Sequence, residues 1–159
     1  CSDHGYHLGE HGFWQKSNFH EEVTRVPLII TAPGMPSGRT QSLVELVDIF
    51  PTLTDLTNIE TPASVQGKSL VPLLKNPASS VRESALSIYN KGQATNSGHA
   101  IRTPKWSFMR YKDGAEEMYD MEHDPLQFTN LADKSEFQTT KKSLTTQLQQ
   151  RLSDAQINK

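Results

Sequence analysis

The sequence predicts an α/β fold in which an incomplete α/β piece is followed by a small antiparallel sheet with a closing helix. One near-continuous apolar run, residues 26–32, is typical of a strand that is buried on both faces of a parallel sheet. Four short β-rich segments separated by turn residues follow from about residue 85. Apolar side chains then recur at helical spacing near the end of the chain. These changes in pattern divide the chain into residues 1–80 and 81–159.

The first part begins its regular structure with the apolar run, which ends at the turn signal Pro33-Gly34. Three further elements are expected after it: a short strand over 43–47, a helix from 48 to about 58, and a helical turn over 70–74. Asp48 fits the N-cap of that helix, and Pro51 is tolerated in its first turn. Because a parallel strand needs neighbours that are reached through crossovers, and only one or two candidates are present, this part looks incomplete.

The second part predicts four short strands, over 85–89, 99–103, 106–111 and 116–119. Lys112-Asp113-Gly114 is a hairpin signal between the third and the fourth strand. A helix is predicted over 135–157, because its apolar residues share one face: Phe137, Leu144, Leu148 and Leu152. This helix is expected to pack on the antiparallel sheet.

Composition excludes several classes of partner. The chain has 159 residues, of which 35% are hydrophobic, and this is long enough for one domain with a core. Its longest apolar run is too short to cross a bilayer, and no signal peptide is recognisable in the first residues, so no membrane partner is expected. A net charge of -2 argues against a nucleic-acid partner. The single cysteine, Cys1, excludes an internal disulfide.

The stretch SDHGYHLGEHGFWQK, residues 2–16, concentrates the candidate chemistry. Asp3 and His4 place a hard oxygen ligand beside an imidazole, and Gly5 lets the backbone turn directly after them. In open α/β sheets, ligands bind at the carboxyl ends of strands, where this stretch would lie. The pair is therefore a candidate metal site. The alternative is a turn in which Asp3 caps backbone N–H groups.

His7 and His11 are four residues apart with Glu10 between them, a spacing that in a continuous helix would bind zinc. The glycines at positions 9 and 12 make such a helix improbable. We expect His11 instead to position the loop or to line a pocket.

Lys16 is the sharper candidate, because an ammonium near a metal-bound oxyanion supplies positive charge to the transition state. The alternative is a solvated surface lysine. Tyr6, Phe13 and Trp14 are expected to be packing residues, and Trp14 fits a pocket wall equally well. Arg25 is expected to pair with Glu21 or Glu22. Structural pairing is also expected for Arg102 and His99, and the alternative is that these two reach the substrate cleft.

Residues 2–30 resemble the C-terminal metal-site segment of the sulfatases, and within them the iduronate-2-sulfatase branch. The resemblance continues, in the order of the family, through LVELVDIFPTL, VQGKSLVPLL, AIRTPKWSFMRY and EEMYDMEHDPLQFTNLAD, and reaches about residue 133. It implies the fold of the C-terminal part of a sulfatase, in which residues 1–80 are the end of the catalytic α/β domain and residues 81–159 are the C-terminal antiparallel sheet with its helix. Its collinearity is more specific than any one motif.

The resemblance assigns roles to several residues of the opening stretch. It implies that Asp3 and His4 ligate a divalent cation, usually calcium, and that Lys16 is the catalytic lysine that contacts the sulfate. A nitrogen ligand is unusual in a calcium site, so manganese and zinc stay open. Tyr6 and His7 fall in the loop that borders the sugar pocket, and His11 is expected to line the same pocket. The implied partner is a sulfated sugar or another sulfate ester.

The implied reaction is sulfate-ester hydrolysis, in which a cysteine converted to formylglycine attacks sulfur while the cation and nearby lysines neutralise the sulfate oxygens. The motif of that cysteine, Cys-x-(Pro or Ala)-Ser-Arg, is absent, and Cys1 is followed by Ser2-Asp3-His4 instead. We therefore expect a missing N-terminal sulfatase portion to supply formylglycine and the remaining metal ligands. Alone, this chain is expected to be inactive and to hold the cation poorly.

Two alternatives stay open at this point. A phosphonate or phosphodiester hydrolase of the same superfamily would also use Asp-His-Gly with a metal. An inert accessory module would use its antiparallel sheet to bind a partner or a glycan. By resemblance, the compartment is exported or lysosomal.

Overall fold

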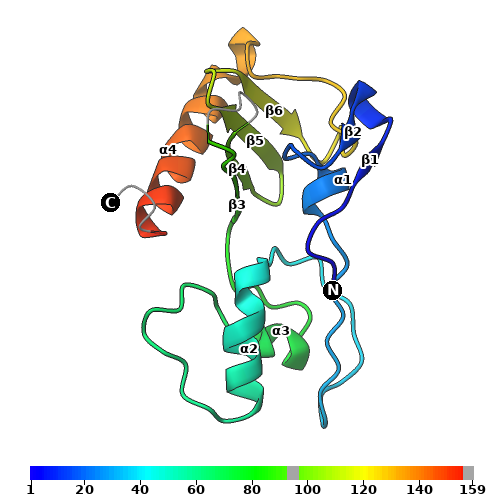
Figure 1. Ribbon diagram of the computed structural model, residues 1–159, viewed down its shortest axis with the longest axis vertical. Coiled ribbons are helices and arrows are strands. Elements are labelled where there is room, and N and C mark those ends of the chain that lie inside the picture. Colours follow the sequence, from blue (N-terminus) through cyan, green and yellow to red (C-terminus); the bar gives the residue numbers. More distant parts are fainter. Residues whose placement is uncertain (93–96, 156–159) are drawn as a thin grey trace. The chain divides into compact units, whose positions relative to one another are not determined.

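A computed structural model describes residues 1–92 and 97–155, and these form two compact units (Figure 1). The sheet unit comprises residues 1–28 and 86–159, and the helical unit comprises residues 29–85. The change near residue 85 lies close to the predicted one at residue 80. Residues 1–28, however, group with the sheet and not with the segment that follows them. The assignment of residues 1–80 to the catalytic domain of a longer protein stays a prediction.

The sheet has four antiparallel strands in the order β3-β4-β5-β6. Their bounds are β3 Ala85–Tyr89, β4 Gly98–Arg102, β5 Trp106–Tyr111 and β6 Glu116–Asp120. All four predicted strands are confirmed within one residue. The predicted turn between β5 and β6 is also confirmed, and Gly114 has the positive φ of 91° that this turn requires.

Helix α4, Gln138–Asp154, covers one face of the sheet (Figure 1). It follows the short 3-10 turn η3, Ser135–Phe137. The predicted apolar positions are buried in one core cluster, whose fully packed members are Ile101, Phe108, Met118, Ala132, Leu144, Leu148 and Leu152. Burying one such large side chain contributes about 1.5–3 kcal/mol. The predicted helix is confirmed as far as Asp154, and its last two positions, 156 and 157, lie outside the described residues.

The opposite face of the sheet carries a second core cluster, made of Phe19, Ala100, Met109, Tyr119 and Met121. Successive strand residues point to opposite faces, so neighbours such as Ala100 and Ile101 belong to different clusters. Phe19 comes from the opening stretch of the chain. The N-terminal segment is therefore packed on the face of the sheet that α4 leaves open.

The helical unit contains α2, Ile49–Leu56, and α3, Val71–Lys75, which lie side by side (Figure 1). Both predicted helical segments are confirmed, although α2 ends two residues earlier than expected. The predicted strand over 43–47 is wrong. The 3-10 turn η2, Leu46–Asp48, occupies its end, because Asp48 accepts a hydrogen bond from the backbone N–H of Glu45 at 2.8 Å.

Asp48 stands at the N-cap position of α2 but does not cap it with its side chain. Its carboxylate is fully buried and also accepts hydrogen bonds from the backbone N–H of Lys68 at 2.8 Å and from the guanidinium of Arg82. The same guanidinium binds Glu45 at 2.5 Å. A buried ion pair therefore organises the centre of the helical unit.

The predicted parallel strand over 26–32 is also wrong. In the described part of the chain, both sheets omit this segment, and Ile29 is 84% exposed. A strand forms only where a neighbour accepts and donates its backbone hydrogen bonds, and the segment lies beside no such neighbour in either sheet. None of the helices described is both long and apolar enough to span a bilayer.

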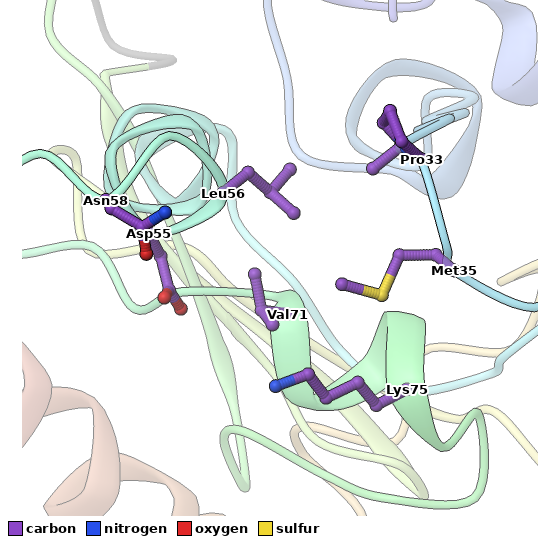
Figure 2. Close-up of a pocket in the computed structure, with 8 residues that line it drawn as sticks. Pro33, Met35, Asp55, Leu56, Asn58, Val71 and Lys75 are labelled. Carbon is purple, nitrogen blue, oxygen red and sulfur yellow. The ribbon is translucent and has the colours of Figure 1, made fainter.

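The helical unit has one further feature, a pocket of about 360 Å³ (Figure 2). Figure 2 shows Leu56 and Val71 pointing into it from the two helices, with Pro33 and Met35 on the facing loop. Asp55 and Lys75 lie at its edge, but the side chain of Asp55 is already bonded to Ser69 at 2.5 Å. No site residue predicted from the sequence lines this pocket.

Candidate functional site

The candidate residues lie on an antiparallel ribbon at the start of the chain, defined as β1 His7–Leu8, the turn η1 Glu10–Gly12, and β2 Trp14–Gln15. The turn needs left-handed backbone at three positions: Gly9, His11 and Gly12 have φ values of 126°, 56° and 66°. Glycine adopts such values without strain, which explains the glycines on both sides of His11. The ribbon is followed by the short helix α1, Glu21–Thr24.

Gly5 fixes the start of the chain against α1. Its backbone N–H donates a hydrogen bond to the carbonyl oxygen of Val23 at 2.8 Å. A Cβ atom at this position would lie 1.8 Å from the carbonyl oxygen of Glu22. Only glycine permits this approach, so the backbone that carries the two preceding residues, Asp3 and His4, is held in place by α1.

His4 presents one ring nitrogen to the candidate site. Its Nδ1 lies 2.8 Å from the carbonyl oxygen of Gly5, which can only accept, so Nδ1 carries the hydrogen. The lone pair of Nε2 is then directed away from that bond, and Nε2 lies 3.6 Å from Oδ2 of Asp3. A backbone carbonyl that fixes the tautomer in this way is the usual support of a metal-binding histidine.

Lys16 completes the group, because its ammonium donates a hydrogen bond to Nε2 of His4. The side chain of Asp3 is 86% exposed, whereas that of His4 is 33% exposed. Hydrogen bonding by its own backbone N–H, followed by the nearby charge of His4, lowers the pKa of Asp3. A carboxylate oxygen, an imidazole nitrogen and an ammonium are thus brought together at the surface.

The donor set of Asp3 and His4 fits a divalent cation in type but not in number. Calcium takes six to eight oxygen ligands, and tetrahedral zinc takes four. Two donors make a partial site. In the described ranges, the one group of three donors within mutual reach is Asp120, Glu122 and His123 at the end of β6, and it contains neither Asp3 nor His4.

The other predicted site residues are placed differently. Tyr6 is 50% exposed beside the candidate group in sequence. His7 is completely buried, and its Nε2 meets the side-chain amide of Asn18. The ring of His11 lies 5.7 Å from that of His7 and 4.1 Å from that of His20. Contact of His7 with a substrate stays a prediction, and it requires the ring to leave this buried position.

Sequence reasoning missed His20 and Glu117, which tie the N-terminal stretch to the sheet. Nε2 of His20 lies 3.0 Å from Oε2 of Glu117 on β6, a residue 97 positions later in the chain. Burial opposes the charge of Glu117, but hydrogen bonds from His20 and Tyr119 outweigh it and lower the pKa of this carboxyl. Nothing in the local pattern around either residue signals a pair of such long range.

The structural pairs expected for Arg25 and Arg102 are confirmed. Glu21 accepts from Nε of Arg102 at 3.0 Å and lies 3.8 Å from Nη1 of Arg25. Phe13 packs edge-on against His7 at 5.6 Å, as a packing residue should. Trp14 does not pack in this way, because 63% of its surface is exposed.

The chain matches a protein family over residues 9–154: the C-terminal part of N-sulphoglucosamine sulphohydrolase. A choline-sulfatase of Rhizobium meliloti is 39% identical over 136 residues, which cover 84% of this chain and 26% of that protein. An N-acetylglucosamine-6-O-sulfatase of Bacteroides thetaiotaomicron is 35% identical over 153 residues, which cover 90% of this chain and 27% of that protein. The chain thus spans about a quarter of the length of these curated relatives.

Solved structures agree with the predicted fold. One, a protein in complex with its substrate D-glucosamine-2-N,6-O-disulfate, superposes with a TM-score of 0.90 at 32% identity over 99% of this chain and 34% of that chain. The predicted fold class is confirmed by this match. A phosphonate monoester hydrolase of Agrobacterium radiobacter superposes with a TM-score of 0.82 over 96% of this chain and 34% of that chain. Its identity of 23% shows the shared fold alone.

Proposed function

We propose that this chain is the C-terminal portion of an enzyme that hydrolyses sulfate esters. The chain belongs to the sulfatase family and corresponds to the C-terminal part of its members. The observation that carries the proposal is the convergence of three side chains on one point of the surface. Oδ2 of Asp3, Nε2 of His4 and Nζ of Lys16 meet there, although Lys16 follows His4 by twelve positions. A carboxylate, an imidazole and an ammonium suit a metal-bound sulfate ester.

The substrate class that we infer is a sulfated carbohydrate. Two relatives support it: one is named an N-acetylglucosamine-6-O-sulfatase, and one solved structure holds D-glucosamine-2-N,6-O-disulfate. Tyr6 offers a half-exposed aromatic ring next to the candidate group, where it would border the sugar. Membership of the iduronate-2-sulfatase branch rests on the resemblance of residues 2–30, which include the Asp3-His4 pair. An exported or lysosomal compartment rests on the family resemblance.

Asp3 and His4 would hold a divalent cation, by preference calcium, and the bound cation would supply Lewis-acid polarisation of the sulfate. The remaining ligands and the formylglycine would come from the N-terminal sulfatase portion. Lys16 binds a sulfate oxygen and neutralises the charge that develops on it. The tautomer of His4 is set by the carbonyl of Gly5, which keeps Nε2 free of a proton. Because Nε2 has one lone pair, a metal bound there would take the place of the hydrogen bond from Lys16 and leave the ammonium for the sulfate.

The experiment compares hydrolysis of a sulfate ester with hydrolysis of a phosphonate monoester by the longer protein that carries this chain. Preferential turnover of the sulfate ester supports the proposal. Preference for the phosphonate ester supports the hydrolase alternative, and binding of a sulfated sugar without turnover supports an accessory module. The 159-residue chain alone should show no turnover. Turnover by the chain alone at the rate of the longer protein contradicts the proposed division of the site.

A further inference from the structure

Three imidazoles lie against one another behind the ribbon, and they belong to different elements. His7 is in β1, His11 is in η1, and His20 is the N-cap residue of α1. The rings of His11 and His20 are stacked, with centroids 4.1 Å apart and planes within 10° of parallel. His7 meets both edge-on at 5.7 Å. We call these three residues the histidine cluster.

The histidine cluster connects the ribbon to the sheet. His20 reaches Glu117 and packs against the ring of Tyr119, both on β6, at 3.0 Å and 5.9 Å. On the other side of the stack, His11 packs against Phe128 at 5.2 Å. Because His20 also begins α1, to which Gly5 is bonded, displacement of the stack would affect both the ribbon and the start of the chain.

Four buried polar atoms in this region make no hydrogen bond: Nδ1 of His7, Nε2 of His11, Nδ1 of His20 and Oε2 of Glu22. In a neutral imidazole, one ring nitrogen carries no hydrogen and can only accept a hydrogen bond. Such a nitrogen can stay without a partner more easily than a buried N–H can. Protonation of His20 turns its Nδ1 into a buried N–H that lacks an acceptor, and this is costly. At His11, the carboxylate of Glu22 lies 3.5 Å from the nitrogen that would take the proton. A proton on His20 therefore works against the packing of the stack.

Carboxylates compensate part of this charge. Glu117 faces His20 from β6, and Glu22 of α1 lies 3.5 Å from Nε2 of His11. Glu10 in η1 carries a further negative charge that His7 and His11 experience. Three of the remaining groups around the cluster are neutral: the amide of Asn18 contacts His7, and the hydroxyls of Tyr119 and Tyr111 bond to Glu117. The carboxylate of Asp124 is more distant and acts on Tyr119. Each ring of the stack thus faces its own carboxylate, but protons on both rings would place two like charges at the stacking distance of 4.1 Å.

We propose that the stacked pair of His11 and His20 is a positioning device, which keeps the ribbon docked while the pair carries at most one proton. A second proton separates the rings and releases the ribbon from β6. Release of the ribbon would also change the spacing of Lys16 and His4. That effect rests on the proposed sulfatase function, because their spacing matters only if they share a substrate. The docking itself does not depend on that function. His11 and His20 are positioning residues here, since neither touches the Asp3–His4–Lys16 group.

The test is an NMR titration of the isotopically labelled chain from about pH 8 to about pH 5, the range in which histidine takes up its proton. Ring signals of His11 and His20 count the protons bound. Cross-peaks between the rings of His20 and Tyr119, and the exchange protection of the Gly5 amide, report docking. No substrate is used, so this experiment and the ester-hydrolysis experiment fail independently.

In the unsubstituted chain, we expect docking to survive the first proton and to be lost with the second. In His11→Gln, the proton on His20 no longer meets a cationic neighbour, so docking should persist to a lower pH than in the unsubstituted chain. His123→Gln is the matched control, because His123 is exposed and pairs with Asp120, away from the histidine cluster. Its docking transition should equal that of the unsubstituted chain.

Two results would overturn the proposal. The first is uptake of two protons by the stack with the His20–Tyr119 cross-peaks and the Gly5 protection intact. The second is a docking transition in His11→Gln that coincides with that of His123→Gln. If His11→Gln does not fold at pH 8, as judged by circular dichroism, the proton count in the unsubstituted chain still decides, because it needs no variant.

Discussion

Nε2 of His4 accepts a hydrogen bond from Nζ of Lys16, although the two residues are twelve positions apart. The ribbon between them folds back on itself and returns the lysine to the imidazole. This relationship explains why a short, glycine-rich stretch holds so many polar groups. The glycines permit the turn, and the turn places an ammonium beside two potential metal ligands.

Replacing Lys16 with alanine tests the role of that ammonium. In the longer protein that carries this chain, we expect Lys16→Ala to lower kcat by about 100-fold to 1,000-fold, the usual effect of removing one group that stabilises an oxyanion. Steady-state kinetics on a sulfate ester measures it. Lys142→Ala, on the exposed side of α4, is the matched control and should leave kcat unchanged. Equal kcat values for the two variants would remove Lys16 from the site.

Replacing Asp3 with alanine tests the metal site. The substitution removes one of two donors and the only anionic one, so we expect metal-supported hydrolysis to be lost in the longer protein. Calorimetric titration with calcium, manganese and zinc should show weak binding to the 159-residue chain, because two donors do not complete any of these coordination shells. Asp133→Ala, an exposed carboxylate in the same chain, is the control. Retention of metal-supported activity by Asp3→Ala would show that the cation is held elsewhere.

The sheet unit could be predicted because each of its elements carries its own signal. The strands 85–89 and 106–111 are bounded by turn residues, and Leu144, Leu148 and Leu152 repeat at helical spacing. The segment 26–32 has an equally strong apolar signal, yet it forms no strand here. Its signal specifies a strand, but only a neighbouring strand can supply the hydrogen bonds.

The candidate site was predictable in part, because some of its residues are close together in the sequence. Asp3, His4 and Lys16 lie within one short stretch, and the structure brings them together. The partner of His20 is 97 residues away, so no local pattern could indicate it. Long-range pairs of buried polar residues depend on tertiary structure, which a single sequence does not reveal.

Replacing Gly5 with alanine tests how α1 holds the metal-site backbone. The new Cβ would lie 1.8 Å from the carbonyl oxygen of Glu22, and the hydrogen bond to Val23 would be strained. We expect the free energy of unfolding to fall by about 1–3 kcal/mol, as in other overpacked sites. Gly114→Ala measures a different effect, the cost of a positive φ, because nothing lies within 4 Å of a Cβ at that glycine and Gly5 has no positive φ. An unchanged free energy of unfolding in denaturant titrations of Gly5→Ala would mean that the close approach of Gly5 contributes nothing.

Arg82 is expected to be the most sensitive residue of the helical unit. Its side chain is 2% exposed and binds the fully buried Asp48. Arg82→Met leaves that carboxylate without its counter-charge, which should cost about 3–5 kcal/mol of unfolding free energy. Denaturant titration measures the loss, with Arg39→Met on the exposed loop as control. A loss no larger than that of the control would show that Asp48 is satisfied by backbone N–H groups alone.

The lowered pKa of Glu117 predicts how stability depends on pH. A carboxyl group whose pKa is lower in the folded chain than in the unfolded chain stabilises the fold. This stabilisation is complete at pH values above the ordinary pKa of 4.5, and it disappears as the pH falls through the lowered pKa. The free energy of unfolding should therefore decrease below about pH 4.5. Glu117→Gln removes the charge that His20 and Tyr119 hold, which should cost about 1–3 kcal/mol at neutral pH and flatten the acid slope. Denaturant titrations at several pH values measure both effects, and Glu136→Gln, an exposed carboxylate, should keep the slope. An unchanged slope in Glu117→Gln would mean that the acid sensitivity of the chain arises from other carboxylates.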